Sequence, residues 1–154
     1  MKKKRIHTIA VVLVILFLCT LLIKAEYENH IKQEALNQVC RSMLSKVDFV
    51  YDYESLSDAE IRAYQAEDIS NLYQADFIIN YTSWPQKDKI HEMLLILYQY
   101  YTRICYNNDV IEASKASAIY ELYLGAYVNI SNDYCEQYIN NLINFIKEEL
   151  KNVT

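Results

Sequence analysis

The sequence predicts an all-α protein, in which an N-terminal transmembrane helix is followed by a small four- to five-helix bundle. One glycine and one proline among 154 residues leave little material for tight turns or bulges. An uncharged apolar run, Ile6 to Ile23, directly follows four basic residues. Beyond Lys24, apolar residues recur at helical spacing in several segments, some of them preceded by capping sequences.

Residues 6–23 are predicted to form a transmembrane signal-anchor helix. At 1.5 Å per residue this run spans about 27 Å, close to the hydrocarbon core of a bilayer at about 30 Å. The basic cluster Lys2-Lys3-Lys4-Arg5 favours a cytoplasmic N-terminus. We therefore expect residues 1–5 to be a cytoplasmic basic tip, residues 6–23 to contact the lipid bilayer, and residues 24–154 to lie outside the cell membrane.

A cleavable signal peptide is the competing interpretation of this segment. The best cleavage site would follow Ala25, but Ile23 stands where such sites need a small residue, and Lys24 lies between them. The sequence therefore favours an uncleaved anchor, with cleavage as the alternative.

The first two helices after the anchor are expected at 24–47 and from Ser57 to about Phe77. Ser57 and Glu60 have the spacing of a capping box, in which each side chain bonds the other's backbone N–H. For the second helix the apolar pattern predicts an inner face and a solvent face. The inner face would hold Ile61, Tyr64, Ile69, Leu72 and Tyr73, and the solvent face Glu60, Arg62, Glu67 and Asp68.

A third helix is expected at 84–106, with Ser83 as its N-cap and Pro85 in its first turn. Its middle, residues 93–98, is apolar on every side, which is typical of a helix surrounded by others. This predicts a core position for Leu94, Leu95, Leu97 and Tyr101.

Two more helices complete the predicted bundle. Asp109 and Glu112 are spaced as a capping box for a fourth helix to about Val128. A fifth helix would start at Ser131 or Asn132 and end near Lys151. Its predicted inner face holds Cys135, Tyr138, Ile139, Leu142, Ile146 and Leu150.

Residues 24–154 form an acidic, tyrosine-rich segment. All 20 acidic residues lie after Ala25, against 10 of the 15 basic ones, so nucleic acid is excluded as a partner. Of the four cysteines, Cys19 lies in the anchor. The other three are interpreted as small buried residues, with a Cys105–Cys135 disulfide as the alternative.

All 15 tyrosines lie outside the predicted anchor. Tyr120, Tyr123 and Tyr127 are three and four residues apart, so they share one side of the fourth helix. They are a possible interaction face, because tyrosine is favoured at interfaces. The alternative is packing: we expect the Ile119 side to be core, Tyr123 to be buried, and the tyrosine side to become exposed near Tyr127.

No catalytic, cofactor-binding or metal-binding constellation is recognisable in the sequence, which predicts a protein that is not an enzyme and needs no cofactor. The favoured function is a single-pass membrane-anchored protein with an extracytoplasmic helical interaction or accessory domain, whose partner is another membrane or surface protein. The alternatives are a ligand-sensing module that works with a membrane partner and, less favoured, a surface hydrolase.

Overall fold

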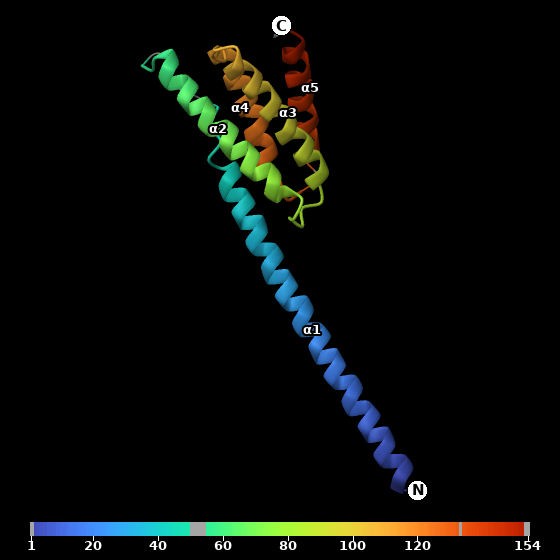
Figure 1. Ribbon diagram of the computed structural model, residues 1–154. Helices are drawn as coiled ribbons and strands as arrows, with labels where there is room; N and C mark the ends of the chain where they lie inside the picture. The colour runs from blue at the N-terminus through green and yellow to red at the C-terminus, as the bar shows by residue number, and fades with distance from the viewer. Residues whose placement is uncertain (1, 50–54, 133, 153–154) are drawn as a thin grey trace. The chain divides into compact units, whose positions relative to one another are not determined.

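The protein is all-α, as predicted. The computed structural model describes residues 2–49, 55–132 and 134–152, and in the helices the side chains from Leu13 to Lys151. This described part contains five helices and no strand (Figure 1). The helices are α1 (Lys2–Leu44), α2 (Asp58–Ile79), α3 (Lys87–Tyr106), α4 (Ala113–Val128) and α5 (Cys135–Asn152).

Contacts divide the chain into two units, residues 1–35 and residues 36–154. The first unit is a single helical stretch, the first part of α1. Its large apolar side chains from Leu13 to Ile23 are 48–66% exposed. Among the residues whose side chains are described, none of the helices combines the length and the apolar character needed to cross a membrane. The predicted span 6–23 lies partly outside those residues, because the side chains of residues 6–12 are not described.

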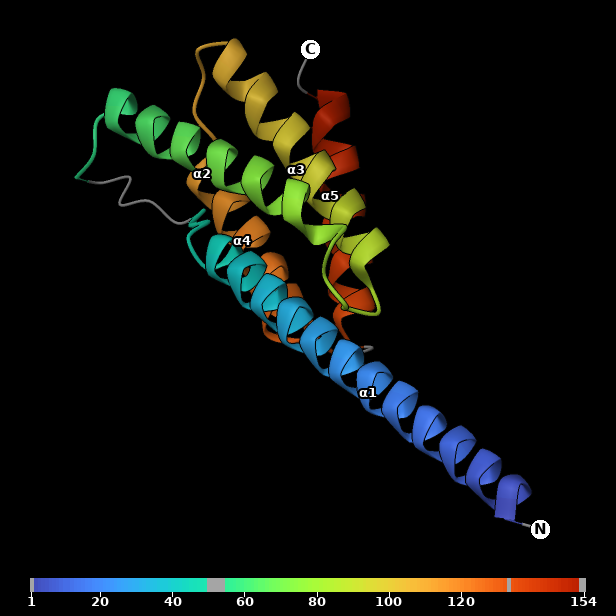
Figure 2. The ribbon, with the colours of Figure 1, turned by 60° about the horizontal axis from the view of Figure 1, so that its bottom comes forward.

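The second unit is a bundle in which α3 packs against both α2 and α5, and α5 also packs against α4 (Figures 1 and 2). The last turns of α1, from Leu36 to Leu44, belong to this unit. They contribute Cys40 and Leu44 to the core, and Val47 and Phe49 follow them into it. The bundle therefore needs the end of α1 to complete its apolar core.

α3 contributes the largest share of that core. Leu94 and Leu97 are fully buried, and Tyr101 is as well. Leu95 is 41% exposed, so the prediction that α3 is enclosed on every side was wrong. The outer side of α3 therefore carries an apolar residue that is partly open to solvent.

α5 is an amphipathic helix, and its apolar face packs against α3 and α4. Cys135, Ile139, Leu142 and Ile146 are fully buried, as the spacing predicted, whereas Tyr138 is 38% exposed. Three ion pairs between helices hold α5 in place: Lys89–Glu136, Lys147–Glu92 (3.3 Å) and Lys115–Glu149 (2.7 Å). The Lys89–Glu136 and Lys147–Glu92 pairs are partly exposed to solvent, so they align the helices but add little stability. Glu149 is more buried, with 15% of its side chain exposed.

Gly125 allows α4 and α5 to approach closely. A methyl group at this position would overlap the ring of Tyr138 on α5. We expect Gly125→Ala to lower the free energy of unfolding by about 1–3 kcal/mol, because the ring must leave its position. Chemical denaturation monitored by Trp84 fluorescence would measure this. Adding Tyr138→Ala to Gly125→Ala should restore part of the loss; equal losses in the two backgrounds would contradict the steric explanation.

The helix starts agree with the sequence only at α2. There the Ser57 hydroxyl accepts the Glu60 N–H at 3.4 Å, and the Glu60 carboxylate accepts the Ser57 N–H at 2.9 Å. Ser83 is not an N-cap, since α3 begins at Lys87 and the Ser83 hydroxyl accepts from Asn37 at 2.9 Å. The Asp109 carboxylate accepts the adjacent Val110 N–H instead of capping α4.

α2 is rotated relative to the predicted orientation. Its buried face contains Ile61, Gln65, Asp68, Leu72, Ala75 and Ile79. Tyr64 and Tyr73, predicted to be inside, are 48% and 61% exposed, and Asp68, predicted to be outside, is buried. The cause is polar: the Asp68 carboxylate accepts the Asp48 N–H at 2.9 Å, and the Asn71 amide donates to the Lys46 carbonyl at 3.5 Å. These bonds satisfy the backbone that follows α1 and turn the aromatic side of α2 outward.

Candidate functional site

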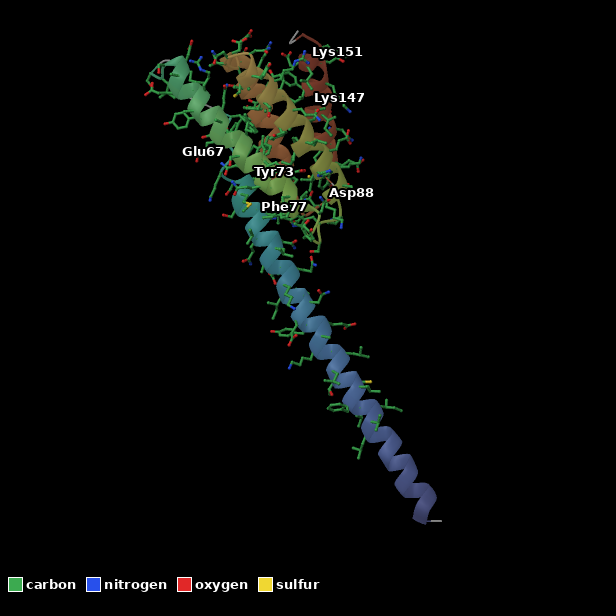
Figure 3. All side chains as sticks on the ribbon, viewed as in Figure 1. Glu67, Tyr73, Phe77, Asp88, Lys147 and Lys151 are labelled. Atoms are coloured by element: carbon green, nitrogen blue, oxygen red, sulfur yellow. The ribbon has the colours of Figure 1, made fainter. Side chains whose placement is uncertain are left out.

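The solvent face of α2 carries a row of exposed aromatic side chains. Tyr73, Phe77 and Tyr81 are 61%, 69% and 58% exposed. They are spaced four residues apart along α2 and the turn that follows it, so they lie on one side of the helix. Figure 3 labels Tyr73 and Phe77 on α2, with Glu67 nearer the start of the helix.

Tyr98 on α3 lies beside this row. The rings of Tyr73 and Tyr98 lie 6.1 Å apart, and those of Phe77 and Tyr81 lie 6.2 Å apart. Both separations fall in the range of favourable ring pairs. We call Tyr73, Phe77, Tyr81, Leu95 and Tyr98 the aromatic surface. Leu95 is included because it is exposed and lies three residues before Tyr98 on α3.

The solvent face of α2 carries very little charge for such an acidic protein. Residues 63–81 are all described, and Glu67 is the only charged side chain among their exposed positions. Contiguous exposed apolar area with little charge is typical of interaction sites. The arrangement is therefore suited to binding an apolar surface and not an ion.

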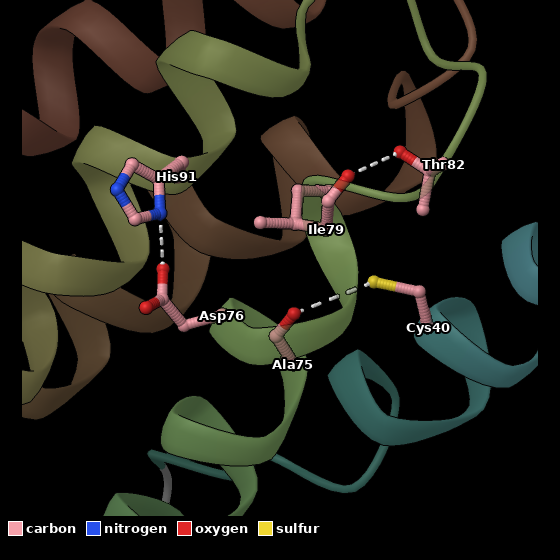
Figure 4. Close-up of polar contacts among 6 residues, drawn as sticks. All are labelled: Cys40, Ala75, Asp76, Ile79, Thr82 and His91. Carbon is pink, nitrogen blue, oxygen red and sulfur yellow. Dashed lines mark hydrogen bonds and ion pairs between the residues drawn. The ribbon is translucent and has the colours of Figure 1, made fainter.

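A polar contact fixes the edge of the aromatic surface between α2 and α3. The Asp76 carboxylate and Nδ1 of His91 lie 2.5 Å apart, and both side chains are partly buried (Figure 4). The contact positions the imidazole and holds the two helices in register.

The neighbouring cysteine is not placed for nucleophilic chemistry. Figure 4 shows Cys40 facing the Ala75 carbonyl at 3.8 Å, away from the Asp76–His91 contact. Burial raises the pKa of the Cys40 thiol to about 12, so it stays protonated.

Cys105 and Cys135 do not form the alternative disulfide; both are free thiols. The Cys135 thiol donates to the Ala126 carbonyl at 3.3 Å, and burial raises its pKa to about 11. Cys135 is thus a core residue of the α4–α5 contact.

The structure divides the tyrosines predicted as a possible interaction face. Tyr123 is only 3% exposed, its hydroxyl donates to the Leu44 carbonyl at 2.7 Å, and its ring packs edge-on against Phe49 at 4.9 Å. Tyr120 and Tyr127 are half-buried and pack against the core. The apolar gap lined by Tyr123 and Tyr127 has no room for a water molecule. As expected, Ile119 is fully buried; it lies four residues before Tyr123, on the same buried side of α4.

The aromatic surface was not predicted from the sequence. Tyr73 was expected in the core, because the apolar pattern of α2 can be aligned with the core in two ways. The signal that could have found the surface is the series Ile61, Gln65, Asp68, Leu72, Ala75 and Ile79. It has regular helical spacing but contains two polar residues.

Comparison of the chain with protein-family models, with curated proteins and with solved structures found no match.

Proposed function

We propose that this chain is a single-pass, membrane-anchored protein whose residues 24–154 form an extracytoplasmic helical interaction domain. Residues 6–23 would cross the bilayer, with the basic residues 2–5 in the cytoplasm. The observation that carries the anchor is the exposed apolar run Leu13–Ile23 within an unbroken helix. In water such exposure is costly, whereas in lipid the same side chains are favourably solvated.

The interaction role is supported by the aromatic surface. Tyrosine and phenylalanine are enriched in the buried centres of protein interfaces, where charged residues are depleted. Tyr73 and Phe77 expose large rings within residues 63–81, where Glu67 is the only charged residue at an exposed position. By contrast, the ring and the hydroxyl of Tyr123 both make contacts inside the bundle, with Phe49 and with the Leu44 carbonyl. We therefore place the interaction surface on α2 and α3.

The anchor is tested by fractionating cells that produce the full chain. We expect it to resist alkaline extraction from membranes, and mass spectrometry should find residues 1–23 still attached. Leu13→Arg should reduce insertion by about 2.5–3.5 kcal/mol, since a charge then lies within the apolar run. Gln38→Arg is the matched control, because Gln38 is an exposed polar position of the same helix. A chain found in the soluble fraction, or one that begins at Glu26, would contradict the proposal.

A further inference from the structure

A stripe of exposed residues along α2 and the turn that follows it has small side chains in its first half and large ones in its second half. Its first half carries the small residues Ala63, Ala66 and Ser70, and its second half carries Tyr73, Phe77 and Tyr81. All six positions are exposed. The five on α2 lie within a narrow arc of the helix, since they are three or four residues apart, and Tyr81 follows in the turn with its ring 6.2 Å from that of Phe77. The stripe therefore has shallow positions at one end and projecting rings at the other.

We propose that this stripe binds a second copy of itself, with the two α2 helices antiparallel across a two-fold axis near Tyr73 and Gln74. The inference rests on the proposed function as an interaction domain and names its partner. In this arrangement Phe77 of each copy lies against Ser70 of the other, and Tyr81 lies against Ala66. Large residues thus meet small ones at both ends, and the interface is isologous. A parallel arrangement would oppose Tyr73 to Tyr73 and Phe77 to Phe77, leaving the small residues without contact.

Charge favours the same arrangement. In the described part of the chain, neither Glu67 nor Lys87 forms an ion pair with another side chain of the protein. The Lys87 ammonium lies 3.5 Å from the Asn80 carbonyl, at the C-terminal end of α2. The distance along the helix from residue 67 to residue 80 is about 20 Å, symmetric about the proposed axis. An antiparallel partner therefore brings Glu67 of one copy toward the end of α2 that carries Lys87 in the other, whereas a parallel one would bring the two Glu67 carboxylates together.

The second copy is also the partner that this face can approach in spite of the protein's acidity. Residues 36–154 contain 17 acidic and 9 basic residues, so most approaches of two copies bring like charges together. The stripe contains no charged residue, and repulsion from more distant charges is screened beyond about 8 Å at physiological ionic strength.

Cysteine crosslinking distinguishes the two arrangements. The full chain would be purified in mild detergent in a Cys19→Ser, Cys105→Ser background, which leaves only the buried Cys40 and Cys135. We expect Tyr73→Cys, close to the axis, to form a disulfide between two copies on mild oxidation. Ala63→Cys should not, because the two Ala63 positions lie about 30 Å apart in an antiparallel pair. Equal crosslinking at both positions would indicate a parallel pair and overturn the inference.

A second measurement tests the surface without cysteines. Phe77→Asp should raise the dissociation constant of the dimer at least about tenfold, measured by sedimentation of the detergent-solubilised full chain. The matched control is Tyr106→Asp, an exposed aromatic on α3 outside the aromatic surface, 89% exposed. Circular dichroism would verify that both variants are folded.

An unchanged dissociation constant for Phe77→Asp, or a full chain that is monomeric, would overturn the inference. Fractionation separates this failure from that of the proposed function. If the chain is monomeric but remains in the membrane fraction, only the proposal that it pairs with a second copy is contradicted. If the chain is absent from membranes, the proposed anchor is contradicted.

Discussion

Leu94→Ala and Leu97→Ala are each expected to lower the free energy of unfolding by about 2–5 kcal/mol, because both remove a fully buried side chain and leave a cavity. α3 packs against α2 and α5, so the surrounding side chains have little freedom to close the gap. Denaturation of the full chain in mild detergent measures the loss. Trp84, the only tryptophan, is 6% exposed and reports unfolding through its fluorescence.

Leu95→Ala is the matched control for these two variants. It makes the same chemical change between the two sites, but Leu95 is 41% exposed. We expect a loss within about 0.5–1 kcal/mol, as for surface substitutions. If Leu95→Ala destabilised the protein as much as Leu94→Ala, an additional element would have to cover the outer side of α3.

Tyr123→Ala should cost about 3–5 kcal/mol, since it removes an aromatic side chain from the core beside Phe49. Tyr123→Phe isolates the hydroxyl. It keeps the ring but removes the hydrogen bond to the Leu44 carbonyl, which still accepts the Val47 N–H at 3.3 Å, so we expect a loss of about 0.5–1.5 kcal/mol. Tyr106→Phe makes the same change at an 89% exposed position and should leave stability unchanged. If Tyr106→Phe lowered the free energy of unfolding as much as Tyr123→Phe, or if Tyr123→Phe did not lower it, this role for the hydroxyl would be contradicted.

The same hydroxyl makes stability depend on pH. Burial first, and then the nearby Asp68 carboxylate, raises the pKa of Tyr123 well above its ordinary value. The unfolded chain then loses this proton at a lower pH than the folded protein. The free energy of unfolding should therefore fall as the pH rises above about 10, the usual tyrosine pKa. In Tyr123→Phe this part of the pH dependence should disappear.

Some local features could be predicted because their causes are local. The Ser57–Glu60 capping box joins residues three apart, so the sequence contains the whole interaction. The buried side of α5 follows from apolar residues at strict helical spacing, with Ile139, Leu142 and Ile146 all inside. The scarcity of glycine and proline predicted the all-α class for the same kind of reason: each acts on the backbone where it stands.

The aromatic surface could not be predicted because its cause lies elsewhere in the chain. The apolar pattern of α2 can be aligned with the core in more than one rotation. The choice depends on Asp68 and Asn71 meeting the backbone at Asp48 and Lys46, which lie 20 and 25 residues earlier. Ser83 and Asp109 are similar cases. Both are residue types that commonly cap helices. However, Ser83 bonds Asn37, 46 residues away, and Asp109 bonds the N–H of the next residue, Val110.

By itself, the sequence determined the helical class, the acidic and tyrosine-rich character, the capped start of α2, and the burial of Ile139, Leu142 and Ile146 on α5. These properties follow from composition and from interactions within one or two helical turns. Only the tertiary structure decided that Tyr123 is core, that Leu95 is exposed, and that Tyr73 and Phe77 face solvent. The physical reason is that burying polar groups requires partners. Where Asp68 and Asn71 turn inward, their hydrogen bonds to the backbone of Asp48 and Lys46 override the hydrophobic pattern of the helix.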